Sequence, residues 1–124
     1  TARGAEKALE AGASGIVVSN HGGRVLDHCP ATAEVLPEIV DAVGGKMTIF
    51  VDGAIRSGMD MFKALALGAD AVLIGRPFVT TVYGGGEEGV QLYVQKLKAE
   101  LADTMRMCGA HSLAEIKRSM LFGF

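Results

Sequence analysis

Cysteine is scarce in this sequence: its 124 residues include two, Cys29 and Cys108, with no CxxC or CxxH spacing. So low a count argues against a disulfide-built scaffold, and no group of His, Cys, Asp and Glu has the spacing of a metal site. We therefore expect no bound metal, reduced thiols that act as small packing groups, and a cytoplasmic location.

Charge of one sign and long apolar runs are missing too. The net charge is −2 and the basic residues form no cluster, which argues against nucleic acid as a partner. No apolar run approaches the roughly 18 residues that a membrane span requires, so we expect no membrane segment. No charged-then-apolar leader precedes the helical pattern of residues 1–12, and we expect the chain to begin inside a fold.

The sequence is rich in hydrophobic residues, which make up 49%, and it has 17 glycines, a composition typical of globular proteins. Three short apolar runs, rich in Val and Ile, are continuous rather than alternating, which predicts parallel strands buried on both faces. Segments with helical periodicity lie between and after them. The predicted strands are Gly15–Ser19, Met47–Asp52 and Ala71–Gly75, and the predicted helices fall within 31–45, 57–68 and 87–109.

One helix–strand unit occurs twice along the chain. Residues 8–19, "ALEAGASGIVVS", align without gaps with residues 64–75, "ALALGADAVLIG". Alternating helices and strands predict a parallel sheet, and repetition of one unit favours a (β/α)8 barrel over an open sheet. A barrel needs about 250 residues. We therefore expect part of a larger protein, or a half-barrel that associates through its open sheet edges.

Residues suited to binding an anion follow each predicted strand. The first strand leads into His21-Gly22-Gly23-Arg24, the second into "DGAIR" (52–56) and the third into "GRP" (75–77). Because the carboxyl ends of parallel strands share one edge of a sheet, the three arginines converge there. The neighbouring small residues let backbone N–H groups approach an oxyanion, and Pro77 can open a helix. The pattern predicts a phosphate or carboxylate site.

Other polar features carry weaker signals. From spacing alone, His21 is as consistent with a hydrogen-bonding turn as with a ligand contact. We expect His28 to be solvated and His111 to be a helix-start or surface residue. The segment "GGGEEG", Gly84–Gly89, lacks the preceding strand of a dinucleotide-binding loop, so we interpret it as a flexible connection into the last helix.

Taken together, these motifs resemble the FMN-dependent α-hydroxy-acid dehydrogenases and oxidases. The resemblance rests on "SNHGGRVLD", "FVDGAIRSGMDMFKALALGADAVLIGRPF" and "GGGEEGV", in unbroken order over nearly the whole chain. It implies the C-terminal portion of a TIM (β/α)8 barrel, about strands 6–8, with residues 1–124 as the C-terminal part of the dehydrogenase domain. It also implies FMN as the cofactor, and oxidation of a small L-2-hydroxy acid, lactate- or glycolate-like, to the 2-oxo acid by the full-length parent.

The resemblance also implies roles for individual residues. His21 matches the catalytic base, which also contacts the substrate, and Arg24 matches the residue that binds the substrate carboxylate. One departure stands out, because Ala54 occupies a position where the family usually has glycine, and its methyl group could crowd a phosphate contact. The implied cofactor-binding residues are Ser19 beside the flavin, Asp52, Gly53, Ala54, Ile55 and Arg56 around the ribityl chain and phosphate, and Gly75 and Arg76 at the phosphate.

Several groups that the family uses ahead of these motifs have no counterpart in the sequence. They are a lysine that polarises the flavin, a carboxylate that orients the histidine, and tyrosines that touch the substrate. We therefore expect the 124-residue chain by itself to be inactive, and to associate with the rest of the barrel or as a homo-oligomer. Two alternatives stay open: an inactive half-barrel that self-associates, and a flavin-free, phosphate-binding barrel enzyme.

Overall fold

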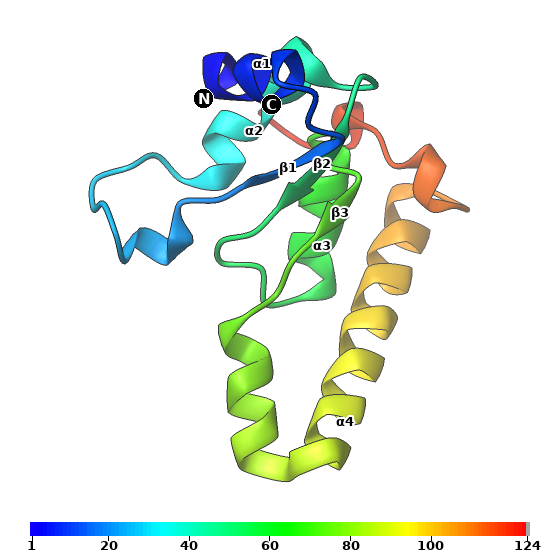
Figure 1. Cartoon of the computed structure of the whole chain (residues 1–124). Coiled ribbons are helices and arrows are strands. Elements are labelled where there is room, and N and C mark those ends of the chain that lie inside the picture. The colour runs from blue at the N-terminus through cyan, green and yellow to red at the C-terminus, as the bar shows by residue number, and fades with distance from the viewer. Residues whose placement is uncertain (124) are drawn as a thin grey trace.

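The computed structural model describes residues 1–123, in which helices alternate with the strands of one three-stranded sheet (Figure 1). The sheet is parallel, with strand order β1-β2-β3. The elements are α1 (Ala2–Glu10), β1 (Gly15–Val18), α2 (Thr32–Val43), β2 (Thr48–Val51), α3 (Gly58–Ala66), β3 (Ala71–Val72) and α4 (Arg76–Cys108), with short helical turns at His21–Gly23, Leu113–Glu115 and Arg118–Met120.

The main core lies between one face of the sheet and the helices. Register pairs Ile16 with Ile49 and Val18 with Val51, and because side chains alternate along a strand, these four point to the same face. Ile49 and Val51 are almost fully buried there. Helices α1, α2 and α3 supply most of the other buried members of this cluster, which are Ala5, Leu36, Ile39, Val43 and Ala64, and the segments next to the strands and helices add Met47, Leu67 and Ala69.

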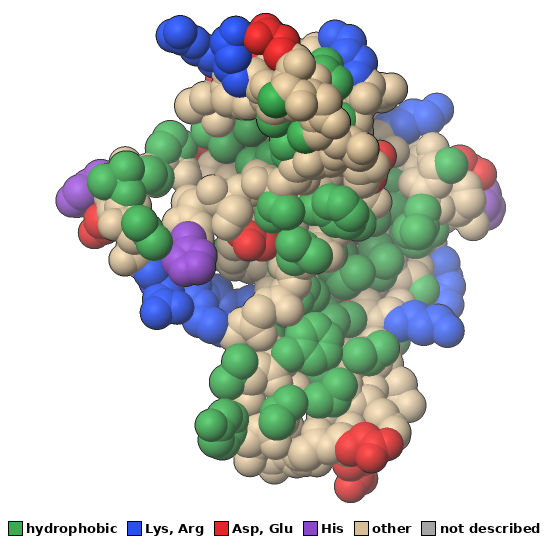
Figure 2. All heavy atoms as spheres, in the orientation of Figure 1, with side chains coloured by type: hydrophobic (Ala, Val, Ile, Leu, Met, Phe, Trp, Pro, Cys, Tyr) green, Lys and Arg blue, Asp and Glu red, His purple; other side chains and the backbone are tan. Residues whose placement is uncertain are grey.

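The other face of the sheet is partly uncovered. Val17 and Leu73 lie on it and are 50% and 42% exposed, and hydrophobic side chains are visible over the sheet in Figure 2. Among residues 1–123, β1 and β3 each have an edge that pairs with no strand. The expectation of strands buried on both faces is therefore wrong within the described residues. A continuous apolar run shows that a strand needs two covering layers but does not show which chain segment supplies the second.

The two sequence repeats form the same local structure. In the first, Gly12 N–H donates to the Leu9 carbonyl and Ala13 N–H to that of Ala8; the corresponding bonds in the second join Gly68 to Leu65 and Ala69 to Ala64. Both glycines have positive φ, 84° and 102°, which lets each helix end and turn into the next strand. The alignment of residues 8–19 with 64–75 therefore reflects one structural unit used twice.

The segment Gly84–Gly89 is not the flexible connection that the sequence indicated. Helix α4 begins at Arg76 and runs to Cys108 as two helical arms that meet at Gly86, whose φ of 54° and ψ of −135° are non-helical (Figure 1). A Cβ on Gly89 would collide with the Thr81 carbonyl oxygen. The glycines therefore allow the two arms to turn and approach each other closely.

Both cysteines are exposed, so the expectation that they act as packing groups is wrong. Cys29 lies in the long loop before α2, and Cys108 is the last residue of α4. Within residues 1–123, no helix is long and apolar enough to cross a membrane.

Candidate active site

The loop after β1 has an unusual backbone conformation. His21, Gly22 and Gly23 have successive positive φ values of 52°, 64° and 72°. Two neighbouring side chains fix this turn: the Gly22 N–H donates to Asn20 Oδ1 at 3.0 Å, and the His21 N–H donates to Ser19 Oγ at 3.0 Å. Only glycine adopts such angles without steric cost, so the glycine pair is required by the turn. His21 has a positive φ despite that cost, and strained backbone conformations of this kind are often found at functional sites.

The loop after β2 is held from α2. Thr32, a buried residue in the first turn of α2, donates its hydroxyl to the Asp52 carbonyl oxygen at 2.6 Å. Gly53 has φ of 94°, and a Cβ there would lie 2.9 Å from Thr32 Oγ1. Ala54 also has positive φ, 61°. The Asp52 Oδ1 atom is buried and has no hydrogen-bond partner within the described part of the chain. It is therefore an acceptor available to a ligand that donates a hydrogen bond.

The loop after β3 passes directly into α4. Gly75 precedes the helix, Arg76 is its first residue, and Pro77 lies in its first turn, as the sequence predicted. A Cβ on Gly22 would collide with Nη2 of Arg76, so the Arg76 guanidinium lies against the β1 loop. The first and third loops therefore touch each other at this edge of the sheet.

The three loops surround one open pocket of about 230 Å³. The structure brings together the predicted site residues here, with the exception of Ser19. Ser19 lines a neighbouring cavity of about 380 Å³ beside β1. The pocket is lined by His21, Arg24, Asp52, Gly53, Ala54, Ile55, Arg56, Gly75 and Arg76, together with Gly22, Leu73, Ile74 and Pro77.

The electrostatics of the pocket are dominated by three cations. Arg24, Arg56 and Arg76 all line it, and none of them forms an ion pair with a residue in the range 1–123. Basic side chains gather beside the β1 loop in Figure 2. Guanidinium groups bind phosphate and carboxylate through paired hydrogen bonds. The expected convergence of the three arginines is confirmed, and the arrangement suits a ligand with one or two anionic groups.

Asn20 and Thr32 hold the loops that line the pocket, but the sequence analysis did not single them out. Asn20 gave a detectable signal, because the side chain of an Asn in a turn typically bonds the backbone N–H two residues on, here that of Gly22. Thr32 gave none, since its bond to the Asp52 carbonyl joins residues 20 positions apart. The two remaining histidines, His28 and His111, are both exposed, as expected.

Comparison with known proteins finds matches that cover almost the whole chain. The family model for FMN-dependent dehydrogenases matches residues 1–122. A peroxisomal (S)-2-hydroxy-acid oxidase of Oryza sativa subsp. japonica is 50% identical over 119 residues, which are 96% of this chain and 32% of that protein. An L-lactate oxidase of Roseobacter sp. (strain GAI101) is 48% identical over 97% of this chain and 32% of its own length.

A solved structure of mandelate oxidase with benzoyl-formic acid superposes with a TM-score of 0.92 and 47% identity, over 95% of this chain and 35% of that chain. The chain thus spans about a third of the length of the curated relatives it matches. The fold is the expected part of a (β/α)8 barrel. These matches confirm the resemblance drawn from the motifs: the chain belongs to the FMN-dependent dehydrogenase family, whose cofactor is FMN.

Proposed function

We propose that this chain supplies the catalytic base, the substrate-carboxylate site and the FMN-phosphate site of an oxidoreductase that converts a small L-2-hydroxy acid to the 2-oxo acid. A lactate- or glycolate-like substrate is the specific form of this proposal. One observation carries it: His21, Arg24, Arg56, Arg76 and the unpaired Asp52 carboxylate line the same pocket at the carboxyl ends of the strands. The names of the relatives, 2-hydroxy-acid oxidase and L-lactate oxidase, support it.

The residues of the pocket fit the ribityl-phosphate part of FMN. Phosphate suits the guanidinium groups of Arg56 and Arg76, and the ribityl hydroxyls are donors that suit the buried Asp52 Oδ1. A Cβ on Gly75 would meet no atom within 4 Å, so the space in front of the first turn of α4 is open. We propose that Asp52, Gly53, Ala54, Ile55, Arg56, Gly75 and Arg76 hold FMN, and that Ser19 contacts the flavin from the neighbouring cavity.

In this proposal, His21 and Arg24 act on the substrate. The neutral imidazole of His21 accepts the proton of the α-hydroxyl group as that group becomes a carbonyl. Arg24 holds the substrate carboxylate through two parallel hydrogen bonds, which fixes the α-carbon near the base. Bound FMN would supply the acceptor for the α-hydrogen and the two electrons of its C–H bond, so that this bond and the O–H bond break as the C=O double bond forms. The strained turn of His21 is kept because Ser19 and Asn20 hold it from the protein side.

The partly uncovered sheet face and the unpaired strand edges indicate where another protein segment binds. Val17 and Leu73 expose apolar surface there, and an exposed apolar face is typical of an interface. We propose that the rest of the barrel in the complete gene product covers this face. A second copy, forming an inactive self-associated half-barrel, is the alternative that the same observation favours.

We place the protein in the cytoplasm, although the first relatives are named as peroxisomal.

The experiment is a comparison of two proteins, the complete gene product and the chain of residues 1–124. Each is incubated with FMN, separated from free flavin, and mixed anaerobically with L-lactate or glycolate while flavin absorbance is followed. We expect the complete gene product to retain FMN and its absorbance to bleach, and the 124-residue chain to show no bleaching. A complete gene product that binds no flavin would contradict the proposal and favour the flavin-free barrel enzyme.

A further inference from the structure

Tyr93, in the second arm of α4, contacts both segments that carry the arginines of the proposed phosphate site: the loop of Arg56 and the first turn of α4. Its hydroxyl donates to the Arg56 carbonyl oxygen at 2.9 Å. Its ring packs edge-on against Phe78, with ring centroids 5.0 Å apart and planes at 72°. Phe78 lies two residues after Arg76 in the first turn of α4. One side chain therefore joins the loop after β2 to the first turn of α4, which carries Arg76.

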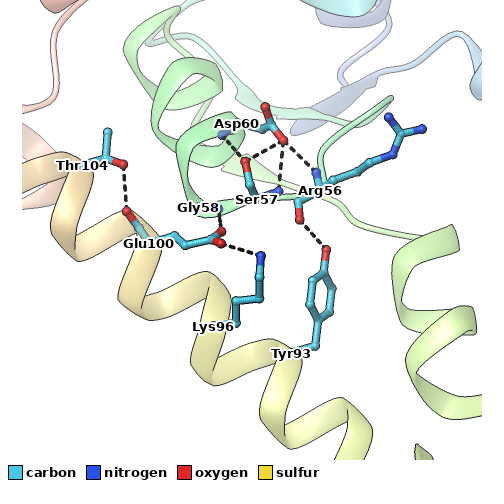
Figure 3. Close-up of polar contacts among 8 residues, drawn as sticks. All are labelled: Arg56, Ser57, Gly58, Asp60, Tyr93, Lys96, Glu100 and Thr104. Atoms are coloured by element: carbon cyan, nitrogen blue, oxygen red, sulfur yellow. Dashed lines mark hydrogen bonds and ion pairs between the residues drawn. The ribbon is translucent and has the colours of Figure 1, made fainter. Parts of the chain in front are cut away.

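The backbone of Arg56 is held on both sides. Its N–H donates to Asp60 Oδ2 at 3.1 Å, and its carbonyl accepts from Tyr93. Asp60 is fixed in turn by the Ser57 hydroxyl at 2.8 Å. Figure 3 shows the Arg56 side chain pointing away from Tyr93 and α4. With both of its peptide groups bonded, Arg56 projects its guanidinium into the pocket from a fixed origin.

The arm of α4 that carries Tyr93 is itself anchored on α3. Gly58 N–H donates to Glu100 Oε2 at 2.8 Å (Figure 3). A Cβ on Gly58 would lie 2.5 Å from the Leu97 carbonyl oxygen, so the start of α3 touches the backbone of α4. Tyr93 lies two helical turns before Glu100 on this anchored arm. Desolvation by burial raises the pKa of the Tyr93 hydroxyl above its ordinary value of 10.0, and it stays a donor near neutral pH.

Resting on the FMN-phosphate site proposed above, we propose that Tyr93 is a positioning residue: it sets the spacing between Arg56 and Arg76 and thereby favours a ligand with a phosphate group over one without. The two arginines follow different strands, and both line the pocket. A phosphate that both bind requires their separation to be fixed before it arrives, since ordering two long side chains on binding lowers affinity. Tyr93 supplies that fixed separation through its hydroxyl on the Arg56 loop and its ring on the first turn of α4.

The test measures the affinity of FMN and of riboflavin, which lacks the phosphate, for the flavin-free complete gene product by fluorescence titration. Tyr93→Phe removes the bond to Arg56 and keeps the ring against Phe78. We expect it to weaken FMN binding by about three- to ten-fold, the range for one lost hydrogen bond, and to leave riboflavin binding unchanged. Tyr93→Leu loses both contacts and should weaken FMN binding further. Tyr83→Phe is the matched control, because Tyr83 is 89% exposed.

Each outcome decides between the two proposals. A Tyr93→Phe protein that binds FMN as the wild type does, or that loses FMN and riboflavin affinity equally, overturns the positioning role. A wild-type protein that does not prefer FMN to riboflavin overturns the phosphate site itself. Should Tyr93→Phe fail to fold, Phe78→Leu removes the ring contact with the Tyr93 hydroxyl left in place. The same loss of FMN preference is expected there, and an unchanged preference would overturn the proposal.

Discussion

The guanidinium of Arg76 lies against the backbone of Gly22, although the two residues follow different strands of the sheet. Both residues line the pocket. Gly22 is needed there for two separate reasons, its φ of 64° and the space that Arg76 occupies. The His-Gly-Gly-Arg motif therefore shapes the proposed phosphate site as well as presenting His21 and Arg24.

Replacing Gly22 with alanine should displace Arg76. The guanidinium is the mobile end of a long side chain, so we expect the fold to accommodate the new methyl group while Arg76 moves from its place. FMN affinity should fall by about ten-fold or more, the value of a charge-assisted hydrogen bond. Gly23→Ala is the control, because Gly23 has a similar φ of 72° but a Cβ there meets only Asp27 Oδ1, at 3.8 Å. Equal FMN affinities of the two variants, measured by titration, would argue against the contact.

The protein should be less stable with alanine at position 54 than with glycine there. A φ of 61° raises the free energy of the folded protein by about 1–2 kcal/mol when the residue is alanine. Replacing alanine with glycine removes this cost, but part of the gain is lost because glycine has more conformational freedom in the unfolded chain. We expect Ala54→Gly to raise the free energy of unfolding by about 0.5–1 kcal/mol. Ala99→Gly, in the exposed middle of α4, should instead lower it by about 1 kcal/mol. Urea unfolding measures both changes. If Ala54→Gly lowered the free energy of unfolding, the claim that Ala54 is strained in the folded protein would be contradicted.

Acid should weaken the contact between α3 and α4 through Glu100. The hydrogen bond from Lys96 and, second, that from the Gly58 N–H hold the pKa of this carboxyl below its ordinary value of 4.5. A carboxyl with a lowered pKa in the folded state adds stability that is fully present above its unfolded pKa and is lost as pH falls through the folded value.

The wild type should therefore lose more stability than Glu100→Gln as pH falls below 4.5. Urea midpoints taken above and below that pH measure the difference. Glu88→Gln, an exposed change in the same helix, is the control and should follow the wild type. Parallel pH profiles for all three proteins would show that Glu100 makes no charge-dependent contribution.

The local elements and the convergence of the site could be predicted from the sequence. The helical pattern within 57–68 predicted α3, and the structure adds that Ser57 and Asp60 cap its start. The arginines after three apolar runs were expected at one edge because parallel strands dictate it, and they line one pocket there. These features depend on residues close in sequence or on a general rule of sheet topology.

The remaining features depend on contacts between distant segments. Gly84–Gly89 was interpreted as a flexible connection because it lacks the strand that precedes a dinucleotide-binding loop, yet the close approach of Gly89 to Thr81 makes glycine necessary in a helical turn. Tyr93 looked like one more residue of a helix, because nothing near it in sequence reveals that its hydroxyl reaches Arg56, 37 positions away. The uncovered sheet face was missed because an apolar strand has the same sequence whichever segment covers it.

The central claim, that His21 is the base of a 2-hydroxy-acid oxidoreductase, is tested most directly by the anaerobic rate of flavin reduction in the complete gene product. His21→Ala should retain FMN, since we place the phosphate contacts on other residues. Its reduction by L-lactate or glycolate should slow by about 10²–10⁴-fold, the usual contribution of a general base. A His21→Ala protein that retains FMN and is reduced at the wild-type rate would contradict the claim.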